Sequence, residues 1–94
     1  MPLSPFEREV LGWVLNDYEA IHTIRSDIAR DLERPVSDEE VGAALLTLAR
    51  AGYVDVFFYD VSSYQFRPAE VDKHPVADLW FLGNKEGVAE EARE

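Results

Sequence analysis

The sequence predicts a small α+β domain in which helices come first and an antiparallel hairpin follows. The chain has 94 residues, enough for one hydrophobic core and a single domain over residues 1–94. A Ser followed three residues later by a Glu, a helix-start signal, occurs at Ser4 and again at Ser37. After Gly52 the apolar spacing changes from every third or fourth residue to every second, which indicates that a helix ends and a strand begins.

The first helix is expected over residues 4–18. Ser4 and Glu7 form its capping box, and Pro5 takes the first helical position, where its missing N–H costs nothing. Apolar residues recur on one face. They are Phe6, Val10, Trp13, Val14 and Tyr18. We therefore expect Trp13 and Tyr18 to pack in the core.

Two further helices are expected over residues 24–33 and 37–51. The second helix begins at a cap from Thr23 or Ser26, and Pro35 makes residues 33–36 a turn because proline cannot continue a helix. The third helix has a capping box at its start and a glycine at its end. Its buried face is Val41, Ala44, Leu45, Leu48 and Ala49.

The second half of the chain predicts strands and a last helix. The expected strands are residues 53–59, 63–67 and 79–82, with a turn at 61–63 and a loop at 68–75. Asn84 is expected to cap a helix over residues 85–94. The predicted core is Phe6, Val10, Trp13, Val14, Ile28, Leu32, Val41, Leu45, Leu48, Val54 and Trp80.

The passage from the third helix into the first long strand resembles the helix-turn-helix and wing of winged-helix domains, as in the MarR-like and PadR-like regulators. The matching residues are Ser37, Val41, Leu45, Leu48, Gly52, Tyr53 and Val54. Leu82 and the run Gly83-Asn84-Lys85-Glu86-Gly87 resemble the ending of many such domains. The resemblance implies a three-helix helix-turn-helix core, a β-wing and a short C-terminal helix. It also places the family's short first strand at Ile21-His22-Thr23-Ile24.

The charge of the chain disfavours binding to nucleic acid. The formal net charge is −10, and the acids are spread along the whole chain, so a polyanion is repelled on average. A helix that reads DNA needs basic or amide side chains on its outward face. The third helix offers only Thr47 and Arg50, and the hairpin adds Arg67.

Composition also argues against several other classes of function. There are no cysteines, and His22 and His74 lie in different segments, so we expect no catalytic site, no cofactor and no metal site. No apolar run approaches the roughly 20 residues of a membrane helix. We expect no membrane partner and a cytoplasmic location.

Two hypotheses remain open, and the first is favoured by a small margin. In the first, the chain is a non-enzymatic module for protein–protein or regulatory interaction, with a protein partner or a homo-oligomer. Its predicted contact residues are Gly42, Ala43, Leu46, Phe57, Tyr59 and Tyr64. In the alternative, the chain is a DNA-binding transcriptional regulator, acting as a dimer, that uses Thr47, Arg50 and Arg67.

Overall fold

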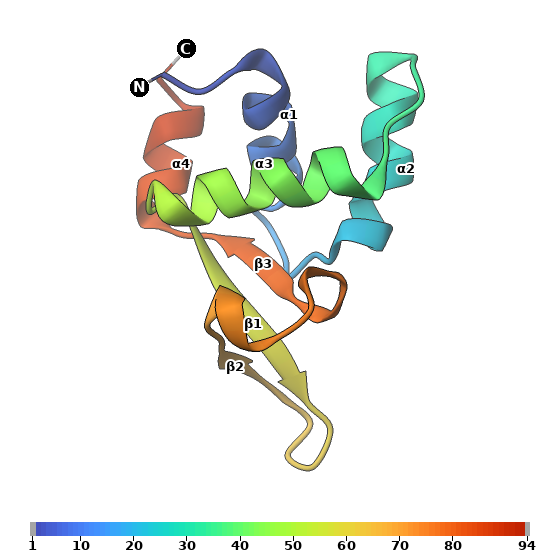
Figure 1. Cartoon of the computed structure of the whole chain (residues 1–94). Coiled ribbons are helices and arrows are strands. Elements are labelled where there is room, and N and C mark those ends of the chain that lie inside the picture. Colours follow the sequence, from blue (N-terminus) through green and yellow to red (C-terminus); the bar gives the residue numbers. More distant parts are fainter. Residues whose placement is uncertain (1, 94) are drawn as a thin grey trace.

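In a computed structural model, which describes residues 2–93, three helices precede a β-sheet and a fourth follows it (Figure 1). The helices are α1 (Pro5–Trp13), α2 (Ile21–Leu32), α3 (Asp38–Arg50) and α4 (Lys85–Glu91). The radius of gyration is 12.7 Å. The predicted α+β class is confirmed. Within the described range, no helix has the length and apolarity to cross a membrane.

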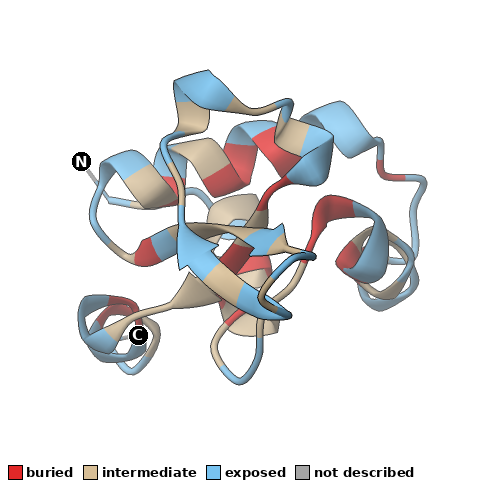
Figure 2. Cartoon of the chain, turned by 90° about the horizontal axis from the view of Figure 1, so that it is seen from below, coloured by how far each residue is buried: buried red, intermediate tan, exposed pale blue. Residues whose placement is uncertain are grey.

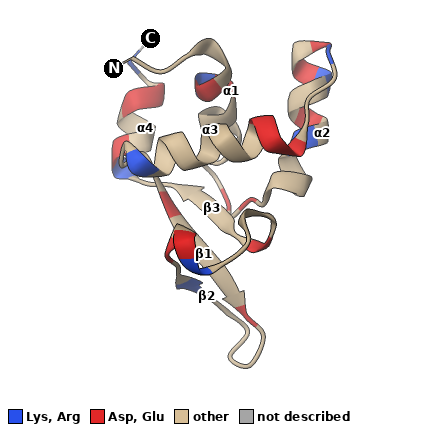
Figure 3. Cartoon of the chain, viewed as in Figure 1, with Lys and Arg blue, Asp and Glu red and all other residues tan. Residues whose placement is uncertain are grey.

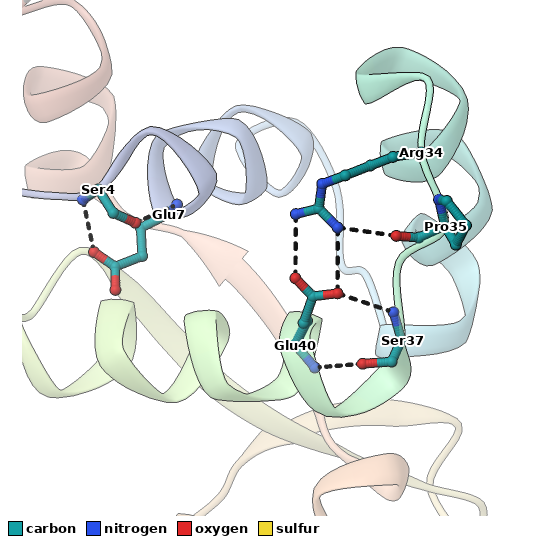
Figure 4. Close-up of polar contacts among 6 residues, drawn as sticks. All are labelled: Ser4, Glu7, Arg34, Pro35, Ser37 and Glu40. Carbon is teal, nitrogen blue, oxygen red and sulfur yellow. Dashed lines mark hydrogen bonds and ion pairs between the residues drawn. The ribbon is translucent and has the colours of Figure 1, made fainter.

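The predicted capping boxes set the starts of α1 and α3 (Figure 4). Ser37 Oγ accepts a hydrogen bond from the Glu40 N–H at 3.1 Å, and the Glu40 carboxylate accepts one from the Ser37 N–H at 3.4 Å. Arg34 also binds Glu40 at 3.1 Å, and this pair lowers the pKa of the Glu40 carboxyl. The start of α3 is therefore tied to the turn after α2.

Two of the N-terminal predictions are wrong. Residues 21–24 are the first turn of α2 and not a strand, and the Thr23 hydroxyl accepts a hydrogen bond from the Ala20 N–H at 3.0 Å. The only pairing near the expected strand is a single bridge between Glu19 and Phe81. Helix α1 ends at Trp13 instead of residue 18, because the Val14 carbonyl accepts from the Gly83 N–H at 2.7 Å and the chain leaves the helix alongside the sheet.

The sheet contains β1 (Val54–Asp60), β2 (Gln65–Pro68) and β3 (Trp80–Gly83), all antiparallel, in the order β2-β1-β3. All three predicted strands are confirmed within two residues. The loop predicted at 68–75 contains one short 3₁₀ turn, η1 (Val71–Lys73), and a second, η2 (Val76–Asp78), follows it. Both run across one face of the sheet (Figure 1).

Both outer edges of the sheet are short or covered. On the β3 side, the Glu19 N–H donates to the Phe81 carbonyl at 2.9 Å and the Phe81 N–H donates back to Glu19 at 2.8 Å. On the β2 side the strand has four residues and ends at Pro68, which has no N–H. Strand β1 is therefore the central strand, with residues 57–60 paired to β2 and residues 54–57 paired to β3.

The core lies between the helices and one face of the sheet (Figure 2). Seven of the predicted core residues are buried, namely Val10, Val14, Ile28, Val41, Leu45, Leu48 and Val54. Phe6, Trp13 and Leu32 are partly buried at its margin. The prediction that Trp80 is a core residue is wrong by one position. Leu79 and Phe81 on either side of it are buried, and Trp80 faces the other side of the sheet.

Helix α4 packs beside α1 through a mostly buried ion pair. Arg8 Nη2 lies 2.6 Å from the Glu90 carboxylate, whose side chain is 7% exposed. This hydrogen bond holds the pKa of the Glu90 carboxyl below its ordinary value. Asn84 caps α4 as predicted, since its side chain accepts from the Gly87 N–H at 3.0 Å.

Candidate functional site

An apolar groove of about 390 Å³ lies along the outward face of α3. One wall is η2, which contributes Val76 and Ala77, and Ile21 of α2 lies at the groove as well. The α3 residues that line it are Asp38, Glu39, Gly42, Ala43 and Leu46. The structure thus brings together the three α3 residues that the sequence predicted for a partner surface.

Gly42 allows the walls of this groove to approach one another. A Cβ atom at Gly42 would lie 3.1 Å from Ile21 Cδ1 and 3.4 Å from Val76 Cγ1. The contact with Ile21 Cδ1 is tight, whereas that with Val76 Cγ1 is ordinary, so a side chain here would require the Ile21 side chain to shift slightly. Gly42 is buried under these neighbours, whereas Ala43 is exposed and Leu46 is half-buried.

Carboxylates stand at the end of the groove where α3 begins (Figure 3). Asp38 pairs with Arg25 at 2.7 Å, although both side chains remain substantially exposed. Glu39 has no ion-pair partner among residues 2–93. Because these acids already compensate the positive end of the helix dipole, a phosphate finds no favourable site there.

The predicted hairpin aromatics do not join this groove. Phe57 and Tyr59 project from the opposite face of the sheet, where they meet an aromatic cluster completed by Tyr18, Phe66 and Trp80. Tyr18 stacks on Phe66 with ring centroids 3.9 Å apart. The surface predicted as one patch is therefore divided between two faces of the molecule.

Tyr64 lies in a third place, at the tip of the β1–β2 hairpin, which projects away from the helices (Figure 1). The tip presents Val61, 73% exposed, and Tyr64, 81% exposed, with Tyr59 nearby at 40%. These are three of the four exposed large hydrophobic residues found within residues 2–93. We call Tyr59, Val61 and Tyr64 the apolar tip.

Asp60 holds the backbone of the apolar tip in place. Its carboxylate accepts from the Ser62 hydroxyl at 2.6 Å, from the Ser62 N–H at 3.0 Å and from Arg67 Nε at 2.8 Å. These donors, led by Ser62 and then Arg67, hold the pKa of the Asp60 carboxyl far below its ordinary value. The tip is therefore anchored by a carboxylate that stays ionised.

The three predicted DNA-contacting residues are separated as well. Arg67 is engaged by Asp60, whereas Thr47 and Arg50 are exposed on α3. Within residues 2–93, seven of the nine basic side chains form ion pairs, and Arg50 and Lys85 are the two that do not. These two flank the junction where Asn84 Nδ2 donates to the Gly52 carbonyl at 2.9 Å.

A second cavity, of about 550 Å³, lies between the helices and is lined largely by acids. Glu9 is central to it, and its Oε2 atom accepts from Trp13 Nε1 at 2.9 Å. A hydrogen bond with Asp31 and burial raise the pKa of the Glu9 carboxyl. No three His, Asp or Glu side chains in the described part of the chain are placed to share a metal ion.

Sequence reasoning missed Ile21, Val76 and Ala77 as groove residues. Ile21 had been assigned to a strand, and Val76 and Ala77 lie in a segment with no apolar period, so only the folded chain reveals them. Comparisons with protein-family models, with curated proteins and with solved structures find no match to this chain.

Proposed function

We propose that this chain is a non-enzymatic, winged-helix protein-interaction module whose main contact surface is the groove on α3. The order of its elements, three helices and then a three-stranded sheet with a projecting hairpin, supports the winged-helix arrangement. The observation that carries the proposed function is the surface of α3. The outward face on which a DNA-binding relative would carry its reading side chains is here an apolar groove with carboxylates at one end.

Energetic considerations favour a protein over a nucleic acid at this surface. Burying apolar surface contributes about 25 cal/mol per Å², whereas a phosphate brought to Asp38 and Glu39 meets like charge. Exposed apolar surface beside charged groups is typical of protein-binding sites. The apolar tip supplies a second exposed apolar surface.

DNA binding by a winged-helix regulator remains the alternative proposal. The observation in its favour is that Arg50 and Lys85, the two basic residues outside ion pairs within residues 2–93, flank the contact between Gly52 and Asn84, and that Arg50 lies one helical turn from Thr47. Two cations would contribute little to DNA affinity, because each phosphate that a cation neutralises releases only about one counterion. We therefore rank this alternative second.

The substitution Leu46→Asp tests the interaction proposal. It places a charge in the groove at a half-buried position, and Val88→Asp adds the same charge at an exposed apolar position on α4 as a matched control. We expect Leu46→Asp to abolish self-association in light scattering, or specific partner capture in a quantitative pull-down, while Val88→Asp leaves both unchanged. Circular dichroism checks that each variant is folded. Association that survives Leu46→Asp would remove the groove from the proposed function.

A further inference from the structure

Resting on the proposed function, we infer that the α3 groove takes a peptide segment in which an apolar anchor residue stands next to Lys or Arg. The groove offers apolar walls from Leu46, Ala43 and Val76 and carboxylates from Asp38 and Glu39. No basic side chain lines it within residues 2–93. The chemistry of the site is thus apolar with negative charge at one end.

The size of the groove fits side chains of a peptide. At about 390 Å³ it lies at the lower end of the range for ligand pockets, roughly 300–1,000 Å³. Its lining comes from α3, from Ile21 of α2 and from η2. Ala43 lines the solvent-exposed side of the groove, and its single methyl group does not obstruct access to the groove.

Charge complementarity determines the rest of the partner's chemistry. Glu39 is exposed and outside any ion pair in the described part of the chain, so it is available to a cation on the partner. Asp38 is shared with Arg25 through a contact that remains largely solvent-accessible. An acidic segment would be repelled by these carboxylates and by the net charge of −10, and a basic one would be attracted and correctly oriented.

A second copy of this chain is a poorer occupant for the same reason. Each copy carries a charge of −10, and its most exposed apolar group, the apolar tip, surrounds the ionised Asp60. Insertion of that tip into the groove would bring Asp60, already paired with Arg67, toward Asp38 and Glu39 and would supply no unpaired cation to them. Like charges at an interface cost affinity, so association with a basic segment is favoured.

A peptide-display selection with a randomised library against the full chain tests this inference. We expect the selected peptides to pair an apolar residue with an adjacent Lys or Arg. Their binding should be lost in Leu46→Asp and kept in Val88→Asp. We call Asp38 and Glu39 the rim of the groove. The rim variant Asp38→Asn/Glu39→Gln should bind the selected peptides about tenfold more weakly, as expected for the loss of two exposed charge contacts.

A matched control separates the rim from the overall charge. Glu70→Gln/Asp72→Asn removes the same two charges near η1, away from the groove lining, and should leave peptide affinity within about twofold. Equal weakening in the rim and control variants would show that basic preference comes from net charge, and would overturn the inference. A selection that enriches no peptides would overturn it too.

Three outcomes separate the result for this inference from the result for the proposed function. Apolar peptides without basic residues that bind in a Leu46-dependent way would overturn the inference and leave the interaction module standing. Selected peptides that bind equally well to Leu46→Asp would remove the groove from both. Concentration-dependent dimerisation that Leu46→Asp abolishes, without peptide binding, would make a second copy the occupant and overturn the inference alone.

Discussion

Tyr64 has a backbone conformation that its side chain makes unfavourable. It lies in the left-handed region at φ 55°, and 81% of its surface is exposed at the apolar tip. Left-handed angles cost a residue with a Cβ about 1–2 kcal/mol, and Tyr64 has little packing to offset this. Because this strained conformation gains little packing within the chain, it points to a role for Tyr64 in contact with a partner and not in stabilising the fold.

Replacing Tyr64 by glycine should separate stability from binding. We expect Tyr64→Gly to raise the unfolding free energy by about 0.5–1 kcal/mol, the relief of strain less the added freedom of the unfolded chain. Thermal unfolding should then shift up by about 2–8 °C. Glu33→Gly is the matched control, because Glu33 also has φ 55° but ends α2. Only Tyr64→Gly, and not Glu33→Gly, should lose partner binding. If Tyr64→Gly is more stable but still binds fully, Tyr64 has no role in binding.

Glu9 makes stability depend on pH in a defined direction. Its pKa is raised by Asp31 and by burial, and Arg8, Glu19 and Glu91 also line its cavity. A carboxyl with a raised folded-state pKa binds its proton more tightly in the folded chain. Its favourable contribution is complete below the unfolded pKa and is lost as pH rises through the folded one.

The variant Glu9→Gln should therefore be more stable than the natural chain at pH 7, with the difference shrinking toward zero as pH falls to about 4. Glutamine retains an acceptor for Trp13 Nε1. Urea unfolding followed by tryptophan fluorescence measures both values. Asp72→Asn controls for the loss of one negative charge at an exposed site. A gain in stability no larger than that of Asp72→Asn would contradict the assignment.

At the scale of elements, the docking of α4 depends on Gly87. The Tyr53 carbonyl oxygen lies where a Cβ of residue 87 would stand, and it is backbone that cannot swing aside. Tyr53 also accepts from the Asn84 N–H at 3.1 Å. The glycine in the segment that resembles winged-helix endings thus has a physical reason, the close approach of α4 to the start of β1.

The substitution Gly87→Ala should lower the unfolding free energy by about 1–3 kcal/mol through overpacking. Gly12→Ala is the matched control, since a Cβ there would meet only Glu91 Oε1 at an ordinary 3.5 Å and alanine favours the helix by up to about 1 kcal/mol. The two changes should shift urea midpoints in opposite directions. Stabilisation of similar size by both would mean that helix propensity and not packing decides the result.

Helix α3 carries the centre of the core. Leu45 is fully buried, so Leu45→Ala should cost about 2–5 kcal/mol in urea unfolding. The exposed neighbour Ala43, changed to Ser, should cost well under 1 kcal/mol and serves as the control. A loss below 1 kcal/mol at Leu45 would mean that the inward face of α3 is assigned incorrectly.

Local signals predicted most elements, and tertiary contacts decided the rest. Capping boxes and the change of period after Gly52 fixed α3, β1 and β2 because these signals are satisfied within a few residues. The segment 21–24, expected as a strand from the winged-helix resemblance, is helical because the Thr23 hydroxyl accepts from the Ala20 N–H and stabilises the first turn of α2. The end of α1 depends on Gly83, far away in sequence, and no local pattern reports it.

The candidate site was also predictable only in part, where its residues lie on one element. Gly42, Ala43 and Leu46 share one helix face, so their spacing alone brought them together. Their separation from Phe57 and Tyr59 follows from the segment at 69–78, which crosses one face of the sheet while the aromatic side chains occupy the other. Because residues 69–78 have no regular apolar spacing, their sequence does not predict which face of the sheet they cover.

For the whole molecule, charge separates the two proposed functions. We expect the unmodified chain to show no binding to mixed-sequence DNA duplexes at low salt in fluorescence anisotropy. True DNA binding would weaken steeply with salt, and Arg50→Ala would flatten that slope by about one unit. Arg30→Ala, at an exposed residue already paired with Asp27, controls for the loss of a cation. Tight, salt-sensitive binding reduced only by Arg50→Ala would favour the regulator.

The central position of β1 also bears on aggregation. Its sequence, VDVFFYD, is rich in β-branched and aromatic residues of the kind found in amyloid-forming segments. In the folded chain β2 pairs with residues 57–60 of β1 and β3 with residues 54–57, and the outer edges end at Pro68 and at the Glu19 bridge. A variant that detaches β2 or β3 would therefore expose this strand as a template, so damage to the sheet should produce fibrils or precipitate before it produces a dispersed unfolded chain.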